Sequence, residues 1–164
     1  MSAVFGAFID ALVQEHPESF VVVATVPGVP VSVNKLYSVF RGKKILSKTG
    51  KAFRDRLCAE IARSSTDWKT AIDMVYQRGG AAALLIALYF EDLENKSWVP
   101  GGVSPKGDLQ NPVKRRDASN YIKVTEDAVS LGCGIDDCNN EYVVVRRGQD
   151  AKNPRTEITY VVYK

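Results

Sequence analysis

An uninterrupted apolar run, AAALLIALYF at residues 81–90, constrains the fold of this chain more than any other feature. Its ten residues are too few to cross a bilayer core, which takes about 20 helical residues. Such a run is typical of a central β-strand that is covered on both faces, and a buried helix has the same pattern. The run therefore predicts a core with packing on both sides, and it excludes a membrane span.

The other segments predict helices and strands of ordinary length around that core. The chain has 164 residues, of which 45% are hydrophobic and 25% are charged, and these values fit one globular domain. The order of the segments predicts an α+β fold, with a mixed β-sheet and packed helices. The expected elements are a helix at 3–15, a strand at 20–26, a hairpin at 36–47 around Arg41 and Gly42, a helix from near Ala52 that buries Phe53, Leu57 and Ile61, a short helix at 66–77, a helix at 120–131, and strands at 142–147 and 157–164.

Two further regions of this single domain lie outside the expected sheet and its packed helices. Residues 91–113 contain six proline and glycine residues, a density that predicts a long irregular loop. Loops of that length in compact domains are often functional or mobile. The other region is the amphipathic helix within residues 1–17, whose role the sequence leaves open.

Cysteine and histidine usage indicates a cytosolic protein without a zinc site. The amino terminus has no basic stretch and carries acidic residues, so a cleaved signal peptide is not expected. Cys58, Cys133 and Cys138 are odd in number and form no disulfide framework, which is typical of reduced thiols. The single His16 completes neither a zinc ligand set nor a hydrolytic triad.

Positive charge is concentrated in one part of the sequence. The net charge is 22 minus 19, or +3, which by itself does not identify a nucleic-acid-binding protein. From Lys35 to Arg56, however, eight cations stand against one carboxylate, a local balance of +7. Further basic groups lie at residues 114–116 and at Arg146 with Arg147. One basic run is usually a solvated surface, whereas three such groups around acidic residues favour a polyanion site.

The segment KRRDASNYIK at residues 114–123 leads into the helix expected at 120–131. Asn120, Lys123 and Asp127 share one face of that helix through their three- and four-residue spacing. One face is therefore free for chemistry while the other packs. The stripe expected to be buried contains Tyr121, Val124, Ala128 and Leu131.

Carboxylates stand on both sides of this helix, with Asp117 before it and the pair Asp136 and Asp137 after it. If folding brings these three together, they form a hard oxygen site that suits Mg²⁺ or Mn²⁺. Such an ion supports phosphodiester hydrolysis, and a nearby lysine can offset charge on the phosphate. The ordinary alternatives are helix capping by Asp117 or Ser119, an exposed pair of Lys123 with Asp127, and turn formation by Asp136 and Asp137.

RRDASNYIKVTEDAV followed by GIDD resembles the RusA-type Holliday junction resolvases. These are small homodimeric Mg²⁺-dependent endonucleases of bacteria and phages, with a basic lead-in, a D-x-D-N-x-x-K helix start and a downstream D-D pair. VPGVPVSVNKLY at 26–37 and LSKTGKAFRDRL at 46–57 are similar to earlier parts of the family pattern. The resemblance covers residues 20–62 and 81–164. Relative to the family pattern, the amino-terminal helix and much of the loop at 91–113 look like additions.

The resemblance implies a role for each matched residue. Asp117 corresponds to the first catalytic aspartate, Lys123 to the active-site lysine and Asp137 to the aspartate that completes the metal site, with Asp136 beside it. It also implies a RusA-like homodimer that uses Mg²⁺, or Mn²⁺, on branched DNA in the cytoplasm of a bacterial cell or phage-infected host. The residues expected to contact DNA are Asn34, Lys35, Lys43, Lys44, Lys48, Lys51, Lys114, Arg115, Arg116, Arg146 and Arg147.

Ser119 departs from the family pattern, because the family has its second aspartate at this position. A hydroxyl is a much weaker Mg²⁺ ligand than a carboxylate. Three outcomes stay open: a water-mediated contact, replacement of the missing charge by Asp136 or Asp127, or reduced activity. Asn120 keeps the polar position that follows.

The expected function is a metal-dependent, structure-selective endodeoxyribonuclease that resolves four-way DNA junctions. Two alternatives remain beside it. One is a branched-DNA-binding protein of the same fold that has weak or no hydrolytic activity. The other is a small metal-dependent phosphohydrolase that acts on nucleotides.

Overall fold

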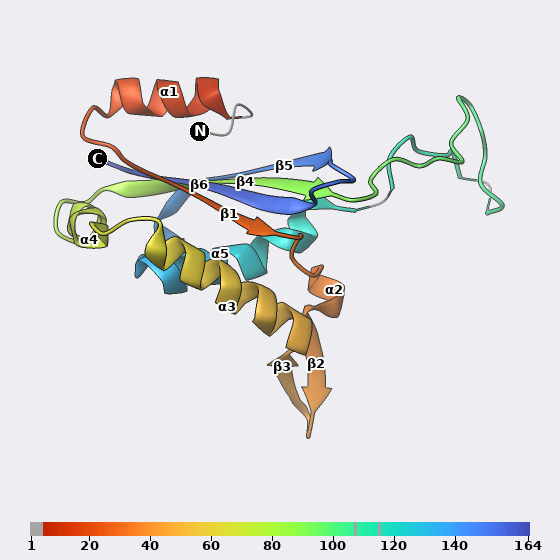
Figure 1. The fold of residues 1–164 in the computed structure, drawn as a ribbon, viewed down its shortest axis with the longest axis horizontal. Coiled ribbons are helices and arrows are strands. Elements are labelled where there is room, and N and C mark those ends of the chain that lie inside the picture. Colours follow the sequence, from red (N-terminus) through yellow and green to blue (C-terminus); the bar gives the residue numbers. More distant parts are fainter. Residues whose placement is uncertain (1–4, 107, 115) are drawn as a thin grey trace.

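A four-stranded mixed β-sheet forms the centre of the computed structural model, which describes residues 5–106, 108–114 and 116–164. The strand order is β1-β6-β4-β5, with β6 antiparallel to β1 and β4, and β5 parallel to β4 (Figure 1). A small α+β domain with a mixed sheet and packed helices is thereby confirmed. The main elements are α1 (Gly6–Glu15), β1 (Phe20–Pro27), α3 (Lys48–Arg63), α4 (Trp68–Tyr76), β4 (Ala81–Phe90), α5 (Ile122–Cys133), β5 (Asn140–Gln149) and β6 (Arg155–Tyr163).

The apolar run predicted to be a central strand is β4, which lies between β6 and β5. Its side chains alternate between two cores: Leu84 and Ile86 pack with α3 and α5, while Leu85 and Ala87 pack with α1. Figure 1 shows α1 on one face of the sheet and α3, α4 and α5 on the other. Because both faces are covered, every position needs an apolar side chain, and each buried Leu or Ile stabilises the fold by about 1.5–3 kcal/mol.

The helices agree with the predicted pattern except in their boundaries. α3 begins at Lys48, before the expected Ala52, because Ser47 caps it by accepting a hydrogen bond from the backbone N–H of Gly50 at 3.2 Å. A short 3₁₀ helix, η1 (Ala118–Tyr121), precedes α5. The first residues of the helix predicted at 3–15 lie outside the described residues. The predicted core positions of α3, Phe53, Leu57 and Ile61, are buried.

The prediction that Leu131 is buried is wrong, because this side chain is 62% exposed. Gly132 faces α3 instead, and a Cβ at this position would lie 2.7 Å from the carbonyl oxygen of Cys58 and 2.8 Å from Cβ of Ile61. The two helices therefore meet at a glycine, and the buried stripe continues to Cys133. A hydrophobic pattern cannot detect such a contact, because glycine contributes no apolar side chain.

Two segments project from the body of the molecule (Figure 1). One is the predicted hairpin, which consists of β2 (Tyr37–Phe40) and β3 (Lys43–Leu46) and follows the short helix α2 (Val33–Leu36). The other is the predicted loop between β4 and η1. Its described residues form no helix or named strand, and their β-pairing consists of the isolated bridges Glu94–Val113 and Val103–Leu109. The loop and the hairpin point in different directions in Figure 1.

The predictions about membrane spans and cysteines agree with the described part of the chain. None of its helices combines the length and the apolar character that crossing a membrane requires. Cys58, Cys133 and Cys138 are free thiols, as predicted.

Candidate active site

An open groove of about 500 Å³ lies between α3, α4, α5 and the turn that follows α5. Its lining combines carboxylates, cations and a phenol, which is a polar composition for a surface formed by packed helices. The groove brings together four predicted site residues and adds two that were not predicted as site residues, one of which belongs to the basic cluster at residues 35–56. The first group is Lys123, Asp127, Asp136 and Asp137, and the second is Arg54 and Tyr76.

Lys123 lies at the centre of the charged part of this groove. Its Nζ is 2.9 Å from Oδ1 of Asp127 and 2.8 Å from Oδ2 of Asp137. Hydrogen bonds to Asp137 and then Asp127 raise the pKa of Lys123, so the ammonium group stays charged at neutral pH. The lysine side chain is 50% exposed, and ion pairs this open stabilise a fold by at most about 1 kcal/mol. The cluster therefore concentrates charge without holding the fold together.

A glycine turn carries Asp137 back to Lys123. Gly134 ends α5 with a φ of 76°, in the left-handed region that favours glycine, and its N–H donates to the carbonyl oxygen of Ser130 at 2.8 Å. The chain then reverses into a 3₁₀ helix, η2 (Asp137–Asn139), which precedes β5. This reversal accounts for the convergence of residues on α5 with a residue that follows the helix.

Asp136 has a structural role in the same turn. Its Oδ1 accepts a hydrogen bond from the backbone N–H of Cys138 at 3.1 Å, which caps η2 and lowers the pKa of Asp136. The backbone N–H of Asp136 donates to the hydroxyl of Tyr76 at 2.9 Å. The prediction that this residue is a turn former is confirmed. Its carboxylate is hydrogen-bonded to the backbone, whereas the Asp137 carboxylate contacts the Lys123 side chain.

Glu126 is a further carboxylate beside this cluster that the sequence interpretation missed. It is half-buried, and burial followed by the neighbouring charge of Asp137 raises the pKa of Glu126, while Lys123 acts in the opposite direction. Nearby, Oδ1 of Asn140 is buried without a hydrogen-bond partner among the described residues. The three-residue spacing from Lys123 could have pointed to Glu126.

Arg54 and Tyr76 could not have been found from local spacing. They come from α3 and α4, and only the packing of these helices against α5 brings them to the groove. Arg54 is itself paired with Asp55 at 2.8 Å.

Asp117 does not line the groove. Its side chain is exposed and makes no capping hydrogen bond, while its carbonyl oxygen accepts from the N–H of Asn120 at 3.0 Å at the start of η1. Ser119 is exposed and Asn120 is half-buried in the same short helix. The described residues contain no group of three or more His, Cys, Asp or Glu side chains that could hold a metal ion. The convergence of Asp117 with Asp136 and Asp137 therefore stays a prediction.

The donor chemistry around Lys123 fits a hard dication. Asp127 and Asp137 supply carboxylate oxygens, and Mg²⁺ in proteins is often held by one or two carboxylates together with waters and substrate phosphates. Sulfur and imidazole ligands, which zinc prefers, are not part of this pair. Both carboxylates now contact the Lys123 ammonium, so a dication would bind in exchange for at least one of these contacts.

The residues predicted to contact DNA form two groups in the structure. The first follows the hairpin and the beginning of α3, where all members with described side chains are exposed. The side chain of Lys44 lies outside the described part. The exposed members are Asn34, Lys35, Lys43, Lys48 and Lys51.

The second group lies where the long loop returns to the sheet, and part of it has structural contacts. Lys114 is paired with Asp92, and the guanidinium of Arg116 lies 5.1 Å from the centre of the Phe90 ring. Arg147 donates a hydrogen bond to the carbonyl oxygen of Arg116. Arg146 is exposed, whereas Arg115 lies outside the described residues. The hairpin group therefore has the freer positive charge.

No protein-family model matches this chain, and no curated protein matches its sequence. The resemblance to the RusA-type resolvases consequently rests on the motifs quoted above.

Proposed function

We propose that this protein is a metal-dependent, structure-selective endodeoxyribonuclease of the RusA type that resolves four-way DNA junctions. The observation that carries the proposal is the contact of Lys123 with Asp127 and Asp137 in an open groove. A protonated lysine beside two hard carboxylates can serve a phosphodiester in two ways. The carboxylates offer oxygen ligands to a dication, and the ammonium offers hydrogen bonds to a phosphate.

The proposed reaction is hydrolysis, in which a water oxygen bonds to phosphorus and one phosphorus–oxygen ester bond breaks. Mg²⁺, when bound, would activate the water and neutralise phosphate charge. Asp137, with Asp127, would hold this ion, and Asp117 stays the predicted further ligand from the start of η1. Lys123 would leave one carboxylate and donate to a non-bridging phosphate oxygen, where negative charge increases in the transition state. Arg54 would hold a neighbouring phosphate at the edge of the groove.

The proposal includes a homodimeric state and a cytoplasmic location at DNA. A four-way junction has two equivalent strands to cut, so two copies related by a two-fold axis would place one groove at each strand. Sedimentation of the free protein and of its junction complex would measure this stoichiometry.

The direct test is cleavage of a synthetic four-way junction in Mg²⁺ and in Mn²⁺. We expect the wild type to cut paired strands and Asp137→Asn to lose at least about 100-fold in rate, because one metal ligand is removed. Asp150→Asn is the matched control, since Asp150 is paired with Arg155 at 2.6 Å and does not line the groove, and this variant should cut like the wild type. Both variants should still bind the junction, because the hairpin cations are unchanged. Equal cutting by Asp137→Asn and the wild type would exclude the proposed site.

A second candidate function is binding of branched DNA without hydrolysis. One observation favours it: Ser119 stands where the family has its second aspartate, and a hydroxyl is a much weaker Mg²⁺ ligand than a carboxylate. It predicts salt-sensitive binding of junctions with no nicked product. Gain of cleavage in Ser119→Asp, with an inactive wild type, would support this candidate over the first.

A further inference from the structure

The β2–β3 hairpin forms a projecting arm with a charged tip. Its strands pair Phe40 with Lys43 and Tyr37 with Leu46, and the two residues between them, Arg41 and Gly42, have φ values of 50° and 76°. Positive φ at both central residues defines the tight turn that matches the twist of a hairpin. Among the described residues, Arg41 is the sole non-glycine with positive φ. The arm thus places an arginine at its tip where asparagine or glycine would be easier to accommodate.

The base of the arm is anchored in the core. Leu36, directly before β2, is fully buried, and its carbonyl oxygen accepts a hydrogen bond from the N–H of Ser47 at 2.7 Å. Gly50 on α3 lies against it, since a Cβ there would be 2.8 Å from Cδ1 of Leu36. The direction of the arm is therefore set by the same helix that carries Arg54 to the groove.

The outer half of the arm exposes apolar side chains that nothing in the described chain covers. Val39 is 72% exposed and Phe40 is 59% exposed. A two-stranded sheet has no second layer, and such hairpins are only marginally stable alone. The guanidinium of Arg41 lies 5.3 Å from the centre of the Phe40 ring, which places an aromatic face and a cation together at the tip.

The charge of the arm favours a polyanion over a second copy of the chain. The arm contains three cations, Arg41, Lys43 and Lys44, and no Asp or Glu, so two such arms would repel each other. On α3, Lys48, Lys51 and Arg54 follow one another at a spacing of three, which puts them on one side of the helix. This stripe leads from the base of the arm to the groove, because Arg54 lines the groove.

We propose that the β2–β3 arm binds nucleic acid beside the groove and stacks Phe40 on an exposed base, as found where a DNA duplex branches. Arg41 and the lysines of the stripe would contact flanking phosphates. Aromatic stacking accepts any base, so the arm would recognise an unstacked base and not a sequence. The inference rests on the proposed function for its partner, but it concerns binding and does not depend on hydrolysis.

The test measures binding to a four-way junction that carries 2-aminopurine at the branch point, in EDTA so that no cleavage occurs. Phe40→Ala should weaken junction binding about tenfold and reduce the fluorescence change of the probe, because base–aromatic stacking is lost. Arg41→Gly keeps the turn, since glycine favours positive φ, and should weaken binding a few-fold through lost charge. Leu109→Ala is the control, because Leu109 is 73% exposed in the other projecting segment, and it should bind like the wild type.

Each other outcome has a defined meaning. Phe40→Ala that binds as tightly as the wild type, with the same probe signal, overturns the proposal even if the wild type cuts junctions in Mg²⁺. A change of oligomeric state in Phe40→Ala at unchanged affinity also overturns it, since the arm would then join two chains. Weaker binding by Phe40→Ala and Arg41→Gly supports the arm even if no Mg²⁺-dependent product appears, and in that case only hydrolysis fails. Thermal melting of the three variants checks that each is folded.

Discussion

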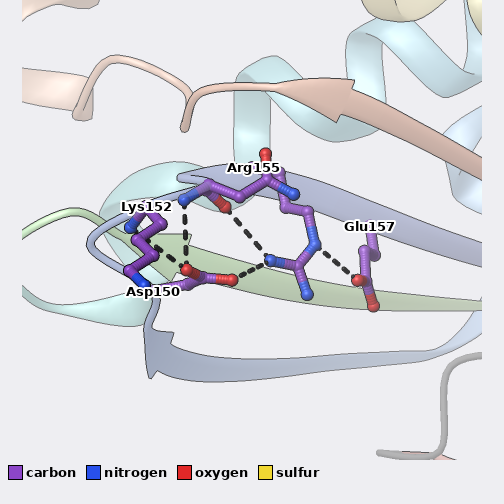
Figure 2. A network of polar contacts seen from close by, with 5 residues as sticks. Asp150, Lys152, Arg155 and Glu157 are labelled. Atoms are coloured by element: carbon purple, nitrogen blue, oxygen red, sulfur yellow. Dashed lines mark hydrogen bonds and ion pairs between the residues drawn. The ribbon is translucent and has the colours of Figure 1, made fainter.

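Two clusters in this protein place one cation between two carboxylates, yet they differ in what the contact can do. Around Arg155, Nη1 lies 2.6 Å from Oδ2 of Asp150 and Nε lies 2.7 Å from Oε1 of Glu157 (Figure 2). Nη1 also donates to the carbonyl oxygen of Asn153 at 3.1 Å, and the guanidinium lies 4.0 Å from the centre of the Tyr89 ring. The Arg155 side chain is only 19% exposed. Lys123, in contrast, is 50% exposed between Asp127 and Asp137.

The difference shows that two clusters of the same charge composition can have quite different geometry and exposure. The planar guanidinium of Arg155 uses several fixed donors and lies over the Tyr89 ring, so several partners together set its position. The compact ammonium of Lys123 makes its contacts in an open groove, where another cation or a phosphate could replace a partner. We therefore interpret the Arg155 cluster as a clamp on the β5–β6 connection and the Lys123 cluster as a site where cations can exchange.

Replacing Lys123 with Met should have the largest effect of these substitutions, and the property affected is cleavage activity. Cleavage of a four-way junction should fall by about 100-fold or more, because the proposed phosphate donor is lost. Mg²⁺ should meanwhile bind more tightly, since Asp127 and Asp137 lose their counter-charge. Calorimetric titration with Mg²⁺, beside cleavage rates, measures both. Unchanged cleavage together with unchanged Mg²⁺ affinity would show that this cluster is an ordinary surface ion pair.

Replacing Arg155 with Met should have an intermediate effect, and on stability. The free energy of unfolding should fall by about 1–2 kcal/mol, because partly buried hydrogen bonds of a charged group are broken. For a chain of this size that lowers Tm by roughly 4 °C. Lys152→Met, which removes an exposed cation of the same turn, should leave Tm nearly unchanged. A larger loss of cleavage per folded molecule in Arg155→Met than in Lys123→Met would reverse the two assignments.

The smallest expected effect is on the pH dependence of the unfolding free energy. This dependence has opposite signs for Glu126, beside the Lys123 cluster, and for Asp150, in the Arg155 cluster. Burial and Asp137 raise the pKa of Glu126, so the folded state binds a proton more tightly than the unfolded state, and unfolding free energy falls as pH rises above the ordinary glutamate range. The hydrogen bond from Arg155 lowers the pKa of Asp150, so its stabilisation is present at neutral pH and is lost as pH falls through the acidic range.

Urea unfolding at a series of pH values separates these contributions. In the wild type, the unfolding free energy should decline by a few tenths of a kcal/mol between about pH 4.5 and neutral, a magnitude that allows for solvent screening. Glu126→Gln should remove this decline. Asp150→Asn should remove the increase in unfolding free energy that the wild type shows as pH rises through the more acidic part of the range. If the two variants changed the slope in the same direction, the environments assigned to the two carboxylates would be wrong.

Much of the fold was predictable because its signals are local. The run at 81–90 predicted β4, the Arg41–Gly42 turn between apolar strands predicted the hairpin, and the four-residue repeat of α3 predicted its buried face. The signal failed at Leu131, where close helix packing uses Gly132. Hydrophobic patterns report which side chains avoid water, and they contain no information about how near two backbones can come.

For the site, the sequence by itself determined the pair of Lys123 with Asp127, since four-residue spacing on a helix brings two side chains together wherever the helix lies. Only the tertiary structure decided that Asp137 returns to this pair through the turn at Gly134, and that Arg54 and Tyr76 join it from other helices. It likewise decided that Asp117 does not line the groove. The physical reason is that contacts along one helix follow from its fixed geometry, whereas contacts between elements depend on how the whole core packs.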